Sequence, residues 1–433
     1  MAITRSQLDA AANALQRVLQ FDRPADAVLH DYFRAHRSLG SHDRAFVAES
    51  VYGVLRRKRT VDHLAPGAMP RRLLLAYLAR LAGASIRELS AATDSDEQAW
   101  LARIKAEPLS GLPLAVRAEL PDWVVERLLA AGSGLAMTYA DASPDPAAVE
   151  AEILALARGL NEPAPLDLRV NTMRASRDEV LQALTADGVA VEPTPWSPVG
   201  LRVRGRPALN RHSLFLSGAF EVQDEGSQLL CYLVAPRRQE MVVDFCAGAG
   251  GKSLMLGAMM RSQGRLYAFD VSAVRLNRMK PRLKRSGLSN LYAQQISNEN
   301  DIRVKRLAGK IDRVLVDAPC SGLGTLRRNP DLKWRQSPLS VEELKRKQAA
   351  ILRAAAGLLK PGGRLVYATC SLLAEENEDI LSGFVAQHPE FRQLACSELL
   401  KEQRIALDTG RDLKLAPHLH GTDGFFAAAL VRA

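Results

Sequence analysis

The sequence of 433 residues predicts an α/β domain with a parallel, doubly wound sheet, preceded by an all-α domain and a small α+β subdomain. Two observations predict this class. Apolar residues recur with a helical period through the N-terminal third of the chain. From residue 241 onward, short apolar strands alternate with helical segments, as in doubly wound sheets. We therefore place the helical domain at residues 1–160, the α+β subdomain at 161–236 and the α/β domain at 237–433.

The helical region begins with a capping signal, since Thr4 and Gln7 have the spacing of a capping box. The segment 43–56 resembles a helix of NusB-like RNA-binding domains, although any amphipathic helix that ends in a basic cluster would show this pattern. After the proline-rich stretch 161–165 the apolar period becomes alternating, as in strands. We expect an RNA-binding helical bundle and, after it, the α+β subdomain.

Composition excludes several classes of protein. With 47% hydrophobic and 24% charged residues the chain is an ordinary globular one, and no stretch approaches the ~18 apolar residues of a membrane span. Arg5 and Asp9 interrupt the region where a signal peptide would need an apolar core. The five cysteines form no CxxC pair and HExxH is absent, so we expect free thiols and no metal. A monomeric cytoplasmic protein that does not bind membranes is predicted.

The formal net charge is +10, and positive charge is densest in residues 271–310. Against Glu299 and Asp301, that segment carries ten basic residues: Arg275, Arg278, Lys280, Arg282, Lys284, Arg285, Arg303, Lys305, Arg306 and Lys310. Such a block suits contacts with nucleic-acid phosphates. A solvated helix face is the alternative.

A glycine-rich turn follows the first strand of the α/β domain and precedes a helix. It consists of Cys246, Ala247, Gly248, Ala249, Gly250, Gly251 and Lys252. Glycines there let the backbone approach a ligand and leave helix amides free. A dinucleotide fingerprint is incomplete because its third glycine would be Ser253, whereas a Walker A loop fails only at its first position, Cys246. A P-loop NTPase therefore stays open as an alternative.

Asp270 favours a different ligand. This residue ends the second strand about 20 residues after the glycine turn, where a carboxylate can accept both ribose hydroxyls. A P-loop protein does not need that carboxylate. A glycine turn with a ribose carboxylate but no pyrophosphate fingerprint suits an adenosyl ligand such as S-adenosylmethionine.

Two cysteines lie at the ends of later strands. Asp317 and Cys320 end one strand and Cys370 ends the next, so both thiols reach the carboxyl edge of the sheet, where neighbouring strands lie ~4.8 Å apart. Two such thiols could flank one planar base, although a buried cysteine is more often part of a core. Cytosine C5 is too weak a nucleophile to take a methyl group unaided, and a thiolate that adds to C6 would activate it. A second group must then remove the C5 proton. A carboxyl group near N3 would support both the addition of the thiolate and the later removal of the proton.

Several motifs together resemble the Sun/RsmB-type family of RNA 5-methylcytosine methyltransferases. They are the turn at 246–252, Asp270-Val271-Ser272, Asp317-Ala318-Pro319-Cys320-Ser321-Gly322, Arg327-Arg328-Asn329-Pro330, Thr369-Cys370-Ser371 and Asp423-Gly424-Phe425-Phe426. The resemblance extends upstream through Leu168-Arg169-Val170-Asn171 and Val222-Gln223-Asp224, and a NusB-like domain belongs to the bacterial rRNA branch of the family.

The resemblance implies a Rossmann-like class I S-adenosylmethionine-dependent methyltransferase that acts on RNA, with 16S rRNA as the expected substrate. Cys370 would be the nucleophile, Cys320 would assist release of the methylated base, and Asp317 would contact cytosine. Residues 246–252 would form the cofactor loop, completed by Asp270, Arg275, Asn298 and Asp317. The sequence departs from the family at Ala249, where proline is common, and at Asn298, where an acidic residue is expected.

Two further alternatives remain at this stage. In DNA cytosine methyltransferases the thiol of the Pro-Cys pair attacks, which would exchange the roles of Cys320 and Cys370. A non-catalytic RNA-binding factor would share the charge and the helical domain.

Overall fold

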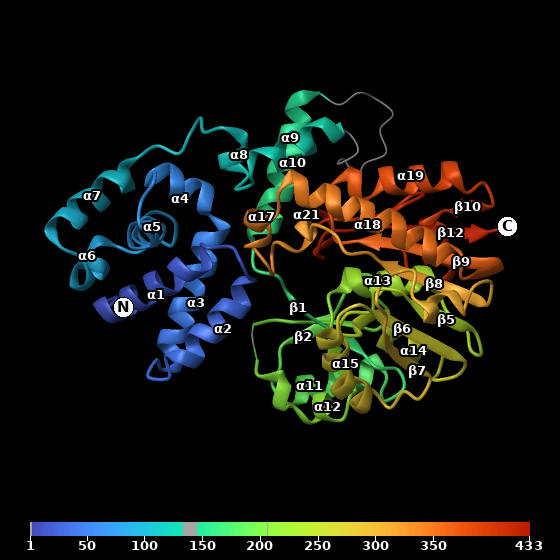
Figure 1. The fold of residues 1–433 in the computed structure, drawn as a ribbon. Helices are drawn as coiled ribbons and strands as arrows, with labels where there is room; N and C mark the ends of the chain where they lie inside the picture. The colour runs from blue at the N-terminus through green and yellow to red at the C-terminus, as the bar shows by residue number, and fades with distance from the viewer. Residues whose placement is uncertain (1, 133–144, 206) are drawn as a thin grey trace. The chain divides into compact units, whose positions relative to one another are not determined.

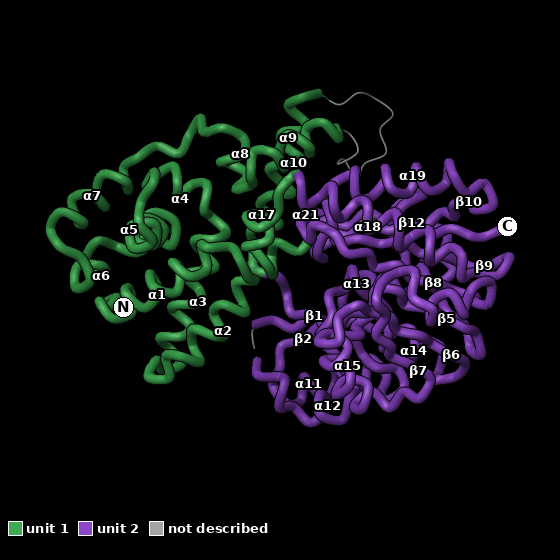
Figure 2. Tube along the Cα trace, in the orientation of Figure 1, with its two compact units in different colours: residues 1–163, 325–338 green, residues 164–324, 339–433 purple. Residues whose placement is uncertain are grey.

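The computed structural model describes residues 2–132, 145–205 and 207–433, which form two compact units (Figure 2). The first comprises Met1–Pro163 with Thr325–Pro338, and the second Ala164–Gly324 with Leu339–Ala433. None of the helices in the described residues is long and apolar enough to span a bilayer. The predicted boundaries after residues 160 and 236 stay predictions.

The first unit is helical (Figure 1). Its helices are α1 (Arg5–Val18), α2 (Ala25–Ala35), α3 (Ser41–Arg56), α4 (Lys58–Leu64), α5 (Pro70–Ala76), α6 (Ile86–Leu89), α7 (Ser95–Ala106), α8 (Leu114–Arg117), α9 (Asp122–Ala131), α10 (Pro146–Asn161) and α17 (Leu332–Arg335). The predicted capping box of α1 is present, because Gln7 N donates to Thr4 Oγ1 at 3.2 Å while the Gln7 side chain accepts from Thr4 N. The apolar stripes of α1, α3 and α5 form one buried core.

Helix α17 belongs to this unit although the chain reaches it only after residue 324. Trp334 Nε1 donates to the Leu55 carbonyl at 2.9 Å, and Asp331 Oδ2 accepts from Ala25 N at 3.2 Å. Lys333 is 1% exposed within the same packing. A segment that lies about 160 residues further along the chain thus completes the core of the N-terminal unit.

The second unit begins with a small antiparallel sheet in the order β2-β3-β1-β4. Its strands are β1 (Leu166–Val170), β2 (Val191–Pro193), β3 (Gly200–Val203) and β4 (Phe220–Val222), accompanied by α11 (Arg177–Ala186), α12 (Ser213–Leu216) and α13 (Glu225–Val234). Alternate residues of β1 and β3 pack on α11, as the change of apolar period at residue 165 predicts. This is the predicted α+β subdomain.

A mixed sheet forms the rest of the second unit, in the order β10-β12-β9-β8-β5-β6-β7, with β11 paired to β12. Its strands are β5 (Met241–Asp244), β6 (Arg265–Asp270), β7 (Leu291–Gln295), β8 (Ile311–Asp317), β9 (Leu359–Thr369), β10 (Phe391–Leu394), β11 (Leu413–Leu415) and β12 (Phe425–Arg432). The strands from β5 to β9 pair in parallel, as predicted. The C-terminal strands are antiparallel and were not predicted, so the sheet is mixed and not wholly parallel.

Helices cover both faces of this sheet (Figure 1). They are α14 (Gly251–Met259), α15 (Ala273–Ser286), α16 (Ile302–Lys305), α18 (Pro338–Ala356), α19 (Glu378–Gln387) and α20 (Cys396–Glu402). The short helix α21 (Pro417–His420) lies between β11 and β12 in the chain. Successive strand residues alternate between two cores, since Val242 packs with α13 and α14 whereas Val243 packs with α18 and α19. Because both faces are covered, the strands read as continuous apolar runs.

Candidate active site

The strand order fixes where a ligand can bind. Within the sheet, β6 and β7 lie on one side of β5, whereas β8 and β9 lie on its other side. The loops that leave β5 and β8 therefore diverge, and such a switch point opens a crevice at the carboxyl ends of the strands. Asp270 and Asp317 are the last residues of β6 and β8 at this edge. The glycine turn follows β5, and the two predicted catalytic cysteines follow β8 and β9.

The glycine turn has the backbone conformations that its sequence requires. Gly248 and Gly250 have φ of +55° and +84°, and a Cβ on Gly250 would lie 2.4 Å from Met279 Cγ. A Cβ on Gly248 would meet nothing within 4 Å, so open space adjoins the turn there. Arg282 Nη1 donates to the Ala249 carbonyl at 2.8 Å and supports the turn from α15. The turn is a preformed cradle beside the start of α14.

Asp270 connects the end of β6 to this cradle. It is 4% exposed, and its two carboxylate oxygens accept from Gly248 N at 2.8 Å and from Ser272 N at 2.7 Å. Each oxygen retains a lone pair, so the carboxylate can also accept from two hydroxyls of a vicinal diol. The donors and acceptors present therefore fit an adenosyl cofactor.

The other predicted cofactor residues lie nearby in the fold but are less constrained. Arg275 is exposed near the start of α15. Asn298 is also exposed, after the end of β7, and its Oδ1 accepts from Asn300 N at 2.8 Å. A cofactor role for either residue stays a prediction.

Lys252 and Asp317 form an ion pair across the switch point. The distance between Lys252 Nζ and Asp317 Oδ2 is 2.7 Å, and the side chains are 13% and 28% exposed. Burial alone would lower the pKa of Lys252, but the charge and hydrogen bond of Asp317 outweigh it and raise that pKa above its ordinary value. The ammonium also lies 5.7 Å from the ring centroid of Phe425. The pair therefore presents a fixed donor and a fixed acceptor beside the glycine turn.

The two thiols at the ends of β8 and β9 contact each other. Cys320 Sγ lies 3.4 Å from Cys370 Sγ and 3.3 Å from the backbone nitrogen of Cys370. The hydrogen bond with Cys370, together with burial and the charges of Cys370 and Glu376, raises the pKa of Cys320 well above that of a free thiol. Burial likewise raises the pKa of Cys246, which lies in the glycine turn. Of these thiols, the structure pairs Cys320 with Cys370.

Glu376 is a fully buried carboxylate near the two thiols, and the sequence did not predict it as a site residue. It accepts hydrogen bonds from Ser321 N at 2.9 Å and from Ser371 Oγ at 2.5 Å. The available signal was a run of acidic residues shortly after Cys370, where a buried strand has just ended. A run of acidic residues ordinarily predicts an exposed segment, and only the tertiary packing at the edge of the sheet buries Glu376.

Two arginines of the basic segment 271–310 are paired within the protein, so not all of its basic side chains are available for RNA phosphates. Arg282 Nε and Arg285 Nη2 donate to the two carboxylate oxygens of Glu221 at 2.9 and 2.5 Å, and the Arg285 guanidinium lies 4.3 Å from the ring centroid of Phe215. These two arginines therefore hold α15 to the α+β subdomain. The exposed basic side chains of α15 are Arg275, Arg278, Lys280 and Lys284.

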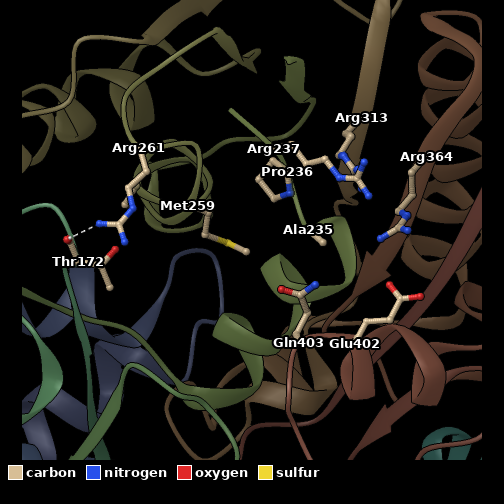
Figure 3. A pocket seen from close by; sticks show the side chains of 11 residues that line it. Thr172, Ala235, Pro236, Arg237, Met259, Arg261, Arg313, Arg364, Glu402 and Gln403 are labelled. Carbon is tan, nitrogen blue, oxygen red and sulfur yellow. Dashed lines mark hydrogen bonds between the residues drawn. The ribbon is translucent and has the colours of Figure 1, made fainter. Parts of the chain in front are cut away.

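A polar pocket of about 330 Å³ lies elsewhere in the second unit (Figure 3). Arg237, Arg313, Arg364 and Glu402 gather on one side of it, and Arg261 donates to the Thr172 carbonyl on the other. It opens near the start of β5 and β8 and contains none of the predicted site residues. Arg313 is paired with Glu240, and both Arg313 and Arg364 donate to carbonyls at the end of α13. The pocket is thus separate from the carboxyl edge.

The sheet order, the glycine turn and the carboxylate at the end of β6 define a Rossmann-like methyltransferase. A family model described as 16S rRNA methyltransferase RsmB/F matches residues 231–431, and a model of the ferredoxin-like domain of RsmF/B-like methyltransferases matches residues 147–209. The chain belongs to the RsmB/F family of 16S rRNA methyltransferases, whose methyl donor is S-adenosylmethionine.

Individual relatives agree with this assignment. The probable ribosomal RNA small subunit methyltransferase B of Synechocystis is 32% identical, over 97% of this chain and 98% of its own length. The ribosomal RNA small subunit methyltransferase B of Shewanella oneidensis is 31% identical, over 90% and 91%. A crystal structure of a methyltransferase homolog protein from Pyrococcus horikoshii superposes with a TM-score of 0.60 at 25% identity, covering 76% of this chain and all of that one.

Proposed function

We propose that this enzyme methylates C5 of a cytosine in 16S rRNA through a covalent mechanism that uses two cysteines. The observation that carries the proposal is the pair of thiols, 3.4 Å apart, at the edge that also holds the Lys252 and Asp317 ion pair. C5 and C6 are adjacent ring atoms, so two thiols this close can act on one C5–C6 bond. Methylation of an exocyclic amine would need neither thiol.

The cofactor would lie against the glycine turn at 246–252, with its ribose on Asp270. S-adenosylmethionine supplies the methyl group when bound there. Asp270 would orient the adenosyl moiety through hydrogen bonds to the ribose hydroxyls while its backbone contacts hold the turn. Arg275, Asn298 and Asp317 complete the proposed cofactor site.

Cytosine would be held by the ion pair. Asp317 can accept from the exocyclic amine N4, and Lys252 can donate to N3 or O2. Because the raised pKa of Lys252 keeps it charged, it can stabilise negative charge that develops on the ring when a nucleophile adds.

Cys370 is the proposed nucleophile. Its thiolate forms a bond to C6, and the electron pair of the C5–C6 double bond moves to C5, which then takes the methyl group. A base removes the proton from C5, the electron pair of that C–H bond restores the double bond, and the Cys370 thiolate leaves. Cys320 is placed to assist the proton removal.

The cause of the raised Cys320 pKa fits this order of events. Its largest contributions include the hydrogen bond to Cys370 and the negative charge there. Once Cys370 has bonded to C6 it carries no charge, so the pKa of Cys320 should fall at the stage when a base is needed.

The two roles predict different failures in single mutants. Cys370→Ala should give neither methylated RNA nor a covalent complex, because C5 is never activated. Cys320→Ala should attack and methylate but release slowly, leaving a protein–RNA adduct that survives denaturing electrophoresis. Cys396→Ala, which removes a thiol buried in the core on one face of the sheet, is the matched control and should retain turnover.

Three results bear on this proposal. An adduct with Cys370→Ala and none with Cys320→Ala would exchange the two roles. Full activity in both variants would exclude the covalent mechanism. Bisulfite sequencing of 16S rRNA incubated with the enzyme would locate the modified cytosine, and absence of any new 5-methylcytosine would reject the C5 reaction.

A further inference from the structure

Glu376 connects the two loops that carry the catalytic thiols. Its Oε1 accepts from Ser321 N and from Gln348 Nε2, each at 2.9 Å, and its Oε2 accepts from Ser371 Oγ at 2.5 Å. Its backbone carbonyl accepts from the Tyr367 hydroxyl at 2.6 Å. One carboxylate thus binds the residue that follows Cys320 and the residue that follows Cys370.

The surrounding bonds make this a closed network. Ser321 Oγ and Ser371 Oγ lie 3.0 Å apart, so the loops also contact each other directly. Gly324 N donates to the Cys370 carbonyl at 2.8 Å. Any displacement of one thiol loop relative to the other must therefore break several hydrogen bonds.

Glu376 has an unusual environment for a carboxylate. It is fully buried, and in the part of the chain that the structure describes no lysine or arginine lies within ion-pair distance of it. A buried carboxylate without a cation is costly unless hydrogen bonds satisfy it, and here the donors come from both thiol loops and from α18.

We propose that Glu376 is a positioning residue that fixes Cys320 and Cys370 as a contacting pair, acting through Ser321 and Ser371. The consequence for catalysis rests on the proposed function, whereas the positioning of the thiols does not. With the carboxylate present, both sulfurs reach one C5–C6 bond without a search of loop conformations. Its charge also contributes to the raised pKa of Cys320, which helps to keep that thiol protonated before the attack.

The thiol pair can be tested without any RNA. Phenylarsine oxide reacts with two thiols, forming two sulfur–arsenic bonds and releasing one water, so tight capture requires two sulfurs held together. We expect the wild-type protein to bind one equivalent, and Cys320→Ser or Cys370→Ser to abolish that binding. Glu376→Gln should weaken capture at least tenfold, because the amide nitrogen cannot accept from the Ser371 hydroxyl.

Two more variants separate positioning from folding. Ser371→Ala keeps the carboxylate and removes one of its bonds, so it should weaken capture in the same direction but less. Glu378→Gln makes the same chemical change two residues away, at a glutamate whose carboxylate pairs with Lys414 at 2.6 Å, and should leave capture within twofold of the wild type.

Kinetics with the full chain provide the second measurement. Glu376→Gln should lower kcat at least tenfold, while the KM for RNA and the affinity for S-adenosylmethionine stay within twofold, because the carboxylate touches neither binding surface. If Glu376→Gln retains both arsenical capture and kcat, the inference is wrong. If Glu376→Gln and Ser371→Ala both lose cofactor binding and unfold early, Glu376 serves general stability and the inference is also wrong.

Failure of the proposed function would look different. A wild-type protein that captures the arsenical but methylates no cytosine would contradict the covalent C5 reaction, yet the loss of capture in Glu376→Gln would still support the positioning role.

Discussion

Asp270 illustrates how one side chain can serve both the fold and the ligand. Its carboxylate already holds two backbone amides, and only its remaining lone pairs face a cofactor. Substitution should therefore disturb the glycine turn as well as remove acceptors for the ribose.

We predict that Asp270→Ala weakens S-adenosylmethionine binding at least tenfold, because charge-assisted hydrogen bonds are worth roughly 1.5–3 kcal/mol each. Asp270→Asn, which can still accept at one atom, should lose less. Isothermal titration calorimetry measures both, with Glu299→Gln as a charge-matched control at the same edge of the sheet. An unchanged affinity in folded Asp270→Ala would remove this residue from the cofactor site.

Individual site residues differed in how far sequence could place them. Asp270 and Asp317 end apolar strands, and both thiols follow apolar strands. Because the carboxyl ends of parallel strands meet at one edge of the sheet, all four residues could be placed there from the sequence. The Lys252 and Asp317 ion pair depends on which strands are neighbours, and no local pattern across a separation of 65 residues encodes that. Glu376 could not be predicted for the same reason, because its burial depends on tertiary packing and not on sequence spacing.

At the scale of the element, α15 carries two sets of basic side chains that differ in their contacts and in their exposure to solvent. Arg282 and Arg285 are committed to Glu221, whereas Arg278, Lys280 and Lys284 are exposed. Only the exposed set is available for RNA phosphates.

Replacing Arg278, Lys280 and Lys284 with glutamine should flatten the slope of log affinity against log salt by up to about 2, since each phosphate contact on single-stranded RNA contributes about 0.7. Filter binding of a 16S rRNA fragment at several salt concentrations measures this slope. The control is a triple glutamine variant on other exposed positions of the second unit: Arg392, Lys401 and Arg404. Equal slopes in wild type and the α15 variant would assign this face to solvated surface.

Strands of the large sheet were predictable to different degrees. Those from β5 to β9 read as apolar runs separated by helices, which implies parallel pairing. β10 and β11 span only 4 and 3 residues, too few for a clear period. The connection from β11 to β12 contains only the short helix α21 and is too short for a parallel crossover, so the two strands pair antiparallel, and this was not inferred.

At the scale of the molecule, we predict that Lys333 makes the stability of the helical unit depend on pH. Burial lowers its pKa to about 7, despite the opposing charge of Glu119, and its ammonium donates to the Arg56 carbonyl at 3.0 Å and to Asn161 Oδ1 at 3.1 Å. Between pH 7 and its ordinary pKa of ~10.4, the unfolded chain binds the proton that the folded chain has released. The free energy of unfolding should therefore rise with pH in this window.

The expected contribution to that slope approaches about 1.4 kcal/mol per pH unit, and Lys333→Met should abolish it. Denaturant titrations at pH 7, 8 and 9, followed by tryptophan fluorescence, give the unfolding free energies. Lys310→Met, at an exposed lysine, should keep the wild-type slope. Parallel curves for wild type and Lys333→Met would show that Lys333 keeps its proton throughout.

The assignment of Thr325–Pro338 to the helical unit also bears on the order of events during synthesis. The ribosome delivers this segment ~160 residues after the rest of the unit, which at roughly 5–20 residues per second is a delay of roughly 8–30 s. Until then the sites of Lys333 and Trp334 are unfilled, with Glu119 and the Leu55 carbonyl lacking their later neighbours. The domain that is synthesised first is thus completed late. Its helical core stays incomplete, and therefore exposed to aggregation, while the glycine turn and the first thiol loop are still being translated.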